Sequence, residues 1–141
     1  MLSASFVVMY SVMFFNVAEI GHIYLSLTRL YMTLLMVCPM ALIMLFSMKG
    51  MYNDRKKNTI LVIVIITLFV LSFIFLRTQT PIGDEQYMKA MISHHSSAIL
   101  TSEEANIQDP EVRQLADDII EIQKREIAQM ENLLDKLENS K

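Results

Sequence analysis

The segment TILVIVIITLFVLSFIFL, residues 59–76, decides the fold class, because its 18 residues are almost all apolar and none is charged. An α-helix of about 20 apolar residues spans a bilayer core, and only helices and closed barrels satisfy their backbone there. A second uncharged run, LYMTLLMVCPMALIMLFSM, covers residues 30–48. Both runs therefore predict membrane-spanning helices.

A third apolar run covers residues 2–20 and contains Asn16 and Glu19 near its end. No Lys or Arg precedes its apolar core and no small-residue cleavage site follows, so a retained helix is favoured over a signal peptide. We thus expect a membrane domain over residues 1–78, with helices at about 2–20, 30–48 and 59–76 and the lipid bilayer as its partner.

Charge separates this domain from the rest of the chain. Residues 1–78 contain six Lys or Arg and two Asp or Glu, which gives a net charge of +4. Residues 79–141 contain six Lys or Arg and thirteen Asp or Glu, which gives a net charge of −7. The loop at 49–58 has four basic residues and the loop at 21–29 has one. The positive-inside rule then predicts a cytoplasmic N-terminus and a C-terminal domain on the far side, periplasmic in a bacterial inner membrane.

Residues 79–141 read as a long antiparallel helical hairpin. The breakers at 80–83 end the last apolar helix, and a new helix is predicted from residue 84 to about 104 or 106. Asp109 is a suitable N-cap and Pro110 a suitable first helical residue, so a second helix should run from there to about residue 138. The predicted fold class is all-α, with three transmembrane helices before the hairpin.

Helical periodicity places Tyr87, Met91 and His95 on one stripe of the first hairpin helix, with Ser93 and Ser97 opposite. The second helix carries an apolar stripe too wide for one partner helix to cover. We therefore predict half of a ferritin-like bundle, completed to a four-helix bundle by a homodimer or a higher homo-oligomer.

Soft donor atoms gather in one layer of this hairpin. Antiparallel pairing places His95 level with Ile122 and Gln123, Met91 near Glu126, and Met88 near Met130. Thioethers and imidazoles suit copper, with Cu(I) favoured over Cu(II). The candidate ligands are Met88, Met91, His94, His95 and Met130, and Gln123 and Glu126 are candidates to orient an imidazole. Alternatively, the methionines only fill the core.

The hairpin resembles the domain of unknown function 305 family. The residues that carry the resemblance are Met88, Met91, Ile92, His94, His95 and Ala98, then Pro110, Val112, Leu115, Ala116 and Ile119, then Gln123, Glu126, Ile127 and Met130. The resemblance implies a ferritin-like helical protein of the cell envelope, with copper as its ligand and these methionines and histidines as its donors. This chain has one such repeat, which argues against high-capacity copper storage.

Two functions are open at this point. The first is a membrane-anchored protein of envelope copper homeostasis or tolerance that sequesters copper or passes it to a copper-handling partner. The second is a structural or regulatory assembly module in which the His-Met layer serves bundle packing or sensing. We predict no enzyme, because the hairpin has no Glu-x-x-His motif and the chain has no His-Glu-x-x-His motif and only three glycines. We also expect no nucleic-acid partner, since the basic residues do not form a patch outside the membrane domain.

Overall fold

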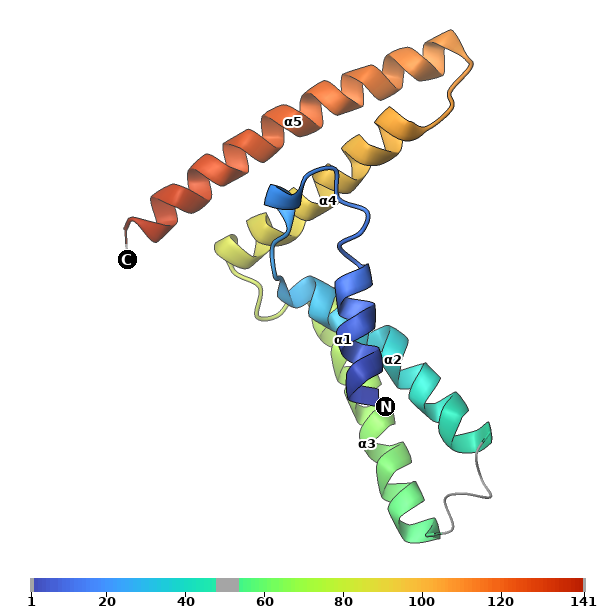
Figure 1. Cartoon of the computed structure of the whole chain (residues 1–141). Helices are drawn as coiled ribbons and strands as arrows, with labels where there is room; N and C mark the ends of the chain where they lie inside the picture. The colour runs from blue at the N-terminus through green and yellow to red at the C-terminus, as the bar shows by residue number, and fades with distance from the viewer. Residues whose placement is uncertain (1, 48–53, 141) are drawn as a thin grey trace. The chain divides into compact units, whose positions relative to one another are not determined.

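The computed structural model describes residues 2–47 and 54–140, and within these ranges the chain is helical and has no strand. The elements are α1 (Leu2–Val12), the 3-10 turn η1 (Ile20–His22), α2 (Leu27–Ser47), α3 (Arg55–Thr78), α4 (Asp84–Glu104) and α5 (Pro110–Glu138) (Figure 1). The all-α prediction is confirmed. The chain forms two compact units, one of residues 1–13 and 27–81 and the other of residues 14–26 and 82–141.

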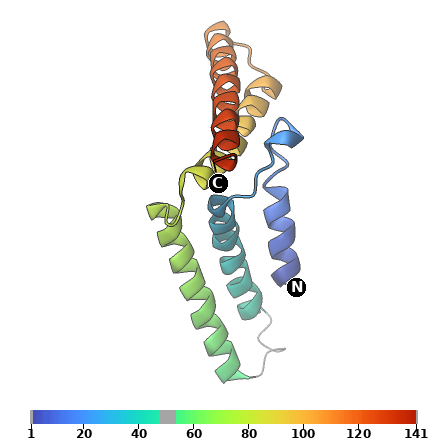
Figure 2. The same ribbon diagram turned by 90° about the vertical axis from the view of Figure 1, so that its left-hand side faces the viewer.

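The first unit contains α1, α2 and α3, which run beside one another (Figure 2). Cys38 and Ala41 of α2 pack with Ile65 of α3 in its buried centre. By length and composition, α2 and α3 could each cross a membrane. Much of α3 is apolar and exposed, including Ile63 at 59% and Phe73 at 52%. Such a surface is stable against lipid and unfavourable in water. Residues 49–53 of the basic loop at 49–58 lie outside the described residues.

The predicted span over residues 2–20 is not supported. Helix α1 has 11 residues, so it rises only about 16 Å, roughly half of a bilayer core. The chain leaves the helix after Val12, and the guanidinium of Arg29 donates a hydrogen bond to the carbonyl of Met13 just beyond it. The predicted cytoplasmic location of the N-terminus depended on this segment crossing the membrane, and it therefore loses its support.

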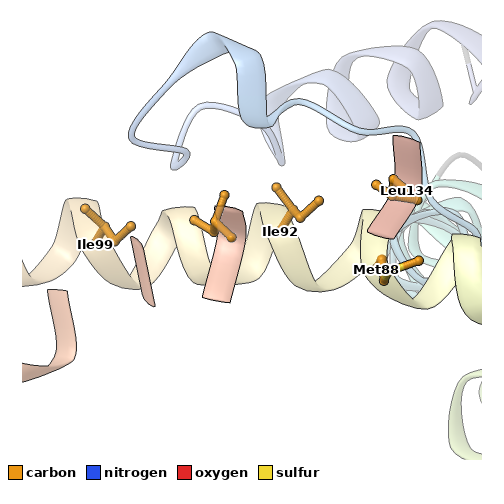
Figure 3. Close-up of a cluster of buried hydrophobic side chains, with 5 residues drawn as sticks. Met88, Ile92, Ile99 and Leu134 are labelled. Atoms are coloured by element: carbon orange, nitrogen blue, oxygen red, sulfur yellow. The ribbon is translucent and has the colours of Figure 1, made fainter. Parts of the chain in front are cut away.

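The second unit is built on the predicted hairpin of α4 and α5 (Figure 1). Asp109 caps α5 as predicted, since its carboxylate accepts hydrogen bonds from the backbone N–H groups of Glu111 and Val112 at 2.9 and 3.0 Å. The buried core between the helices consists of Met88, Ile92, Ile99, Ile127 and Leu134 (Figure 3). Ile92 is completely buried at its centre. The hairpin of one chain has two helices, so the predicted four-helix bundle is not confirmed.

Residues 14–26, which we call the strap, cross α4 within this second unit (Figure 1). The backbone N–H of Ala18 donates to Ser96 Oγ at 2.8 Å, and Ser96 Oγ also lies 2.9 Å from His22 Nδ1. Ser93 Oγ donates to the carbonyl of His22 at 2.7 Å. The Ala18 N–H and both the ring and the carbonyl of His22 are thus paired with hydroxyls of α4.

The strap changes two expectations from the sequence. Ser93 was expected on the outer side of α4, yet both it and Ser96 are completely buried. Asn16 interrupts the first apolar run, and its Nδ2 donates to Ser97 Oγ at 2.8 Å. The predicted domains, 1–78 and 79–141, left the strap with the membrane domain, whereas it belongs to the same compact unit as the hairpin.

Candidate metal-binding groove

A groove of about 750 Å³ runs between α4 and α5, and we call it the methionine groove. It is lined by Asp84, Tyr87, Met88, Met91 and His95 of α4 and by Glu126, Gln129, Met130, Leu133, Lys136 and Leu137 of α5. Four of the five predicted ligands, and one of the two residues expected to orient an imidazole, therefore line one space. Tyr87 was predicted on the same stripe of α4 as Met91 and His95, whereas Gln129 and Lys136 were not predicted as site residues.

Helical spacing explains how α4 presents its donors. Met88, Met91 and His95 stand at positions i, i+3 and i+7, which fall on one side of an α-helix. Met88 is 7% exposed and belongs to the core as well as to the groove wall. Met91 and His95 are half-buried. From the facing helix, Glu126 and Met130 stand four residues apart and line the same space.

The register of the hairpin differs from the prediction by about one turn. His95 was expected level with Ile122 and Gln123, but its Nδ1 lies 3.4 Å from Glu126 Oε2. The residues between α4 and α5 are non-helical from Ala105 to Asp109. Such a five-residue link can span well over 10 Å when extended, so it can carry the start of α5 beyond the end of α4. Gln123 is not among the groove residues, and its buried Oε1 has no hydrogen-bond partner.

His94 is separate from the groove. Its side chain is exposed and borders a different hollow with Ser97, Ala98 and Thr101 of α4 and Ile119 of α5. The ring centroids of His94 and His95 are 6.1 Å apart. Consecutive helical residues point about 100° apart, so the adjacent histidines serve different surfaces. The sequence pattern alone had grouped them as one pair of ligands.

The imidazole of His95 has an unusual environment. Its Nδ1 is buried and makes no hydrogen bond, because the 3.4 Å approach of Glu126 is an ionic contact without hydrogen-bond geometry. Burial lowers the pKa of His95 below its ordinary value of 6.5; the charge of Glu126 opposes this shift and His94 adds to it. The ring is consequently neutral at pH 7 and keeps a lone pair for a ligand.

The donor chemistry of the groove is dominated by sulfur. Among residues 2–47 and 54–140 no group of three or more His, Cys, Asp or Glu side chains is placed to hold an ion. Sites for zinc or for hard cations are built from such groups. The groove instead combines the thioethers of Met88, Met91 and Met130 with one imidazole. This set fits a soft monovalent ion such as Cu(I).

The serines of the strap contact are the residues that sequence reasoning missed. A usable signal was present, because Ser93, Ser96 and Ser97 cluster around the two histidines while Asn16 interrupts an apolar run. Small hydroxyl residues tolerate close approach of another backbone and can satisfy its polar groups. Their pairing over more than 70 residues of sequence could not be read from local periodicity.

Comparison with known proteins places the chain in a family. The model of the domain of unknown function DUF305 matches residues 76–141, which contain both hairpin helices. An uncharacterized protein of Acanthamoeba polyphaga mimivirus is 42% identical over 144 residues, which cover 99% of this chain and 93% of that protein. The similarity to the viral protein therefore extends to the strap and to α1, α2 and α3. No solved structure matches significantly. The chain belongs to the DUF305 family.

Proposed function

We propose that this protein is a membrane-anchored copper-binding protein that holds Cu(I) in the methionine groove and sequesters it or hands it to a copper-handling partner. One observation carries the proposal: three thioethers and an imidazole, from both helices of the hairpin, line one groove. The copper association implied by the family resemblance supports the same ligand. Copper is the cargo here, and no reaction is required.

The groove residues would have different roles in binding Cu(I). Met88, Met91 and Met130 offer uncharged sulfur donors that do not compete with protons. The carboxylate of Glu126 can only accept a hydrogen bond when ionised, so its position beside Nδ1 of His95 favours the tautomer with the proton on Nδ1. The lone pair is then on Nε2, which we propose as the nitrogen ligand. Glu126 would thereby orient the imidazole, as expected for a carboxylate beside a ligating histidine.

The anchor in this proposal is the pair α2 and α3. If both helices cross a membrane and residues 49–58 stay in the cytoplasm, the strap and the hairpin emerge together on the opposite side. The hydrogen bonds of Ala18 and His22 to α4 fit this topology, because they require both segments on one side. The similar protein is viral, so the bacterial inner membrane stays a prediction drawn from the resemblance.

A second candidate is the assembly module, and a specific observation favours it. Leu115, Ile122 and Leu133 of α5 are 59%, 41% and 42% exposed. An apolar stripe on a polar helix is typical of a protein contact. In this function the groove side chains would fill the centre of an assembled bundle and bind no ion.

A Cu(I) competition titration of the full chain in detergent micelles distinguishes the two functions. The parent would be compared with Met91→Leu/Met130→Leu, which removes one thioether from each hairpin helix. The matched control is Met32→Leu/Met36→Leu, which removes two exposed thioethers from α2. We expect stoichiometric binding in the parent and the control, and binding weaker by at least about tenfold, or about 1.4 kcal/mol, in the groove variant. A parent that binds no Cu(I) would leave the assembly module as the function.

A further inference from the structure

The hairpin has one covered side and one open side. The strap covers α4 where Ser93 and Ser96 point. The methionine groove opens on a different side of α4, and its rim reaches solvent at Tyr87, which is 54% exposed. We call the surface that contains the groove and the exposed apolar stripe of α5 the open face. Helix α5 leaves two sides of α4 free. The strap covers one of them, and the open face lies on the other.

The open face has the spacing of a helix-packing seam. On α5, Leu115, Ile119, Ile122, Glu126, Gln129 and Leu133 follow one another at alternating intervals of four and three residues. This is the spacing at which helices pack along their length in bundles and coiled coils. Leu115 and Leu133, near the two ends of the stripe, are among its exposed members. A single hairpin therefore leaves a seam without its partner helix.

We propose that a second copy of this chain covers the open face, with the two α5 helices antiparallel and the four hairpin helices forming one bundle. A two-fold arrangement brings Leu115 opposite Leu133 of the second copy, because an isologous contact pairs the same patch with itself. The axis then passes close to Ile122 and Glu126, midway along the stripe. Each copy thereby closes the groove of the other.

Charge identifies a second copy as the occupant. By helical spacing, Glu111 and Asp118 lie along one edge of the open face in the N-terminal half of α5, and Arg125 and Lys136 lie along the same edge in the C-terminal half. Antiparallel pairing sets the acidic half of one helix against the basic half of the other. A parallel two-fold pairing would set this edge against the opposite edge of the other helix and would lose this match.

One consequence concerns the ligands, and this part alone rests on the proposed function. Met91 and His95 line the groove on the open face, so the donors of both copies would lie within one bundle core. Copper bound there would be shielded from solvent by the second copy. The dimer itself depends on the apolar seam and on the charges, and does not require an ion.

Cross-linking of the metal-free full chain tests the contact. In a Cys38→Ser background, which removes the one native cysteine, Ile122→Cys places a thiol near the proposed axis. Ala128→Cys is the matched control, because Ala128 is exposed and points away from the seam. With a short bismaleimide in detergent and chelator, we expect a covalent dimer from Ile122→Cys and at least about fivefold less from Ala128→Cys. Equal cross-linking of the two variants, or none in either, would overturn the proposal.

The mass of the particle provides the second measurement. Light scattering with detergent correction should give a dimer for the parent and a monomer for Leu115→Asp/Leu133→Asp, with an unchanged helical circular dichroism signal. A monomeric parent, or a folded double variant that stays dimeric, would place the contact elsewhere and contradict the proposal. Because chelator is present throughout, these results do not depend on whether the groove binds Cu(I).

Discussion

Two sides of α4 use polar residues in opposite ways. Under the strap, Ser93 and Ser96 are completely buried and their hydroxyls pair with the chain that covers them. Along the methionine groove, Met91 and His95 are half-buried, and the buried Nδ1 of His95 lacks a hydrogen bond. A buried polar group that is paired stabilises the fold, whereas an unpaired one beside an open space requires another explanation. Here we interpret the first side as structural and the second as a binding site.

The largest effect is expected on the strap side. Ser96→Ala removes the partner of both the Ala18 N–H and the His22 Nδ1. A buried polar group left unsatisfied costs about 1–3 kcal/mol, so the free energy of unfolding should fall by about 2–4 kcal/mol. Denaturant unfolding of the full chain in micelles, followed by circular dichroism, measures this change. Ser97→Ala is the control and should lose less than about 1 kcal/mol, since its bond to Asn16 is exposed. Equal stability of the two variants would mean that the strap does not contribute to the unit.

The groove side should respond to substitution in affinity and barely in stability. Met130→Leu keeps the apolar volume, so the free energy of unfolding should change by less than about 1.5 kcal/mol. The loss of one thioether should weaken Cu(I) binding by about tenfold, or about 1.4 kcal/mol. Competition titration and unfolding of the same preparation give both numbers. If the variant has lower stability and unchanged Cu(I) affinity, Met130 is a core-packing residue and not a copper ligand.

The pH dependence should follow His95. Its pKa lies below the ordinary value of 6.5 because the ring is buried, so Cu(I) affinity should change by less than about twofold between pH 8 and pH 7. Protons compete for the ring only at lower pH, where affinity should decline. Glu126→Gln removes the charge that raises this pKa, so the acid decline should move to lower pH. A shift to higher pH would contradict the role assigned to Glu126.

The sign of the stability change follows from the same shift. The unfolded imidazole takes up its proton before the folded one as pH falls through about 6.5, so the contribution of neutral His95 to stability is lost on the acid side. Unfolding at pH 7.5 and pH 5.5, compared between the parent and His95→Gln, isolates this contribution. The parent should lose more stability than the variant on acidification.

The smallest effect is expected at the ion pair between α4 and α5, which belongs neither to the strap contact nor to the methionine groove. Lys124 Nζ lies 2.9 Å from Glu103 Oε1, and the two side chains are 56% and 41% exposed. An exposed pair contributes about 0–1 kcal/mol, so Lys124→Ala should alter unfolding by no more than that. It should leave Cu(I) affinity unchanged. A larger loss would show that the hairpin depends on surface charge rather than on its core.

Local signals in the sequence predicted the elements well. The breakers at residues 80–83 and the cap at Asp109 placed both hairpin helices within a few residues, because those signals act on neighbouring backbone groups. The apolar run at 59–76 likewise predicted α3, which extends from Arg55 to Thr78. The run at 2–20 was misleading, because apolar composition does not reveal that its second half leaves the helix to contact α4.

The candidate site was predictable in its members and less so in its geometry. Spacing grouped Met88, Met91 and His95 correctly, since i, i+3 and i+7 share a helix side. The separation of His94 follows from the same 100° step and could have been deduced. Glu126 was predicted as a candidate to orient an imidazole, but its position level with His95 was not, because the register depends on the non-helical link before α5. The burial of Ser93 depends on the strap, a contact between segments remote in sequence.

The most direct test of copper binding in the methionine groove is a Cu(I) competition titration of His95→Ala beside His94→Ala. The two substitutions are chemically identical and adjacent, but only His95 lines the groove. We predict that His95→Ala weakens binding by at least about tenfold, or about 1.4 kcal/mol, and that His94→Ala stays within about twofold of the parent. Equal losses in the two variants, or a loss confined to His94→Ala, would contradict a copper site in the groove.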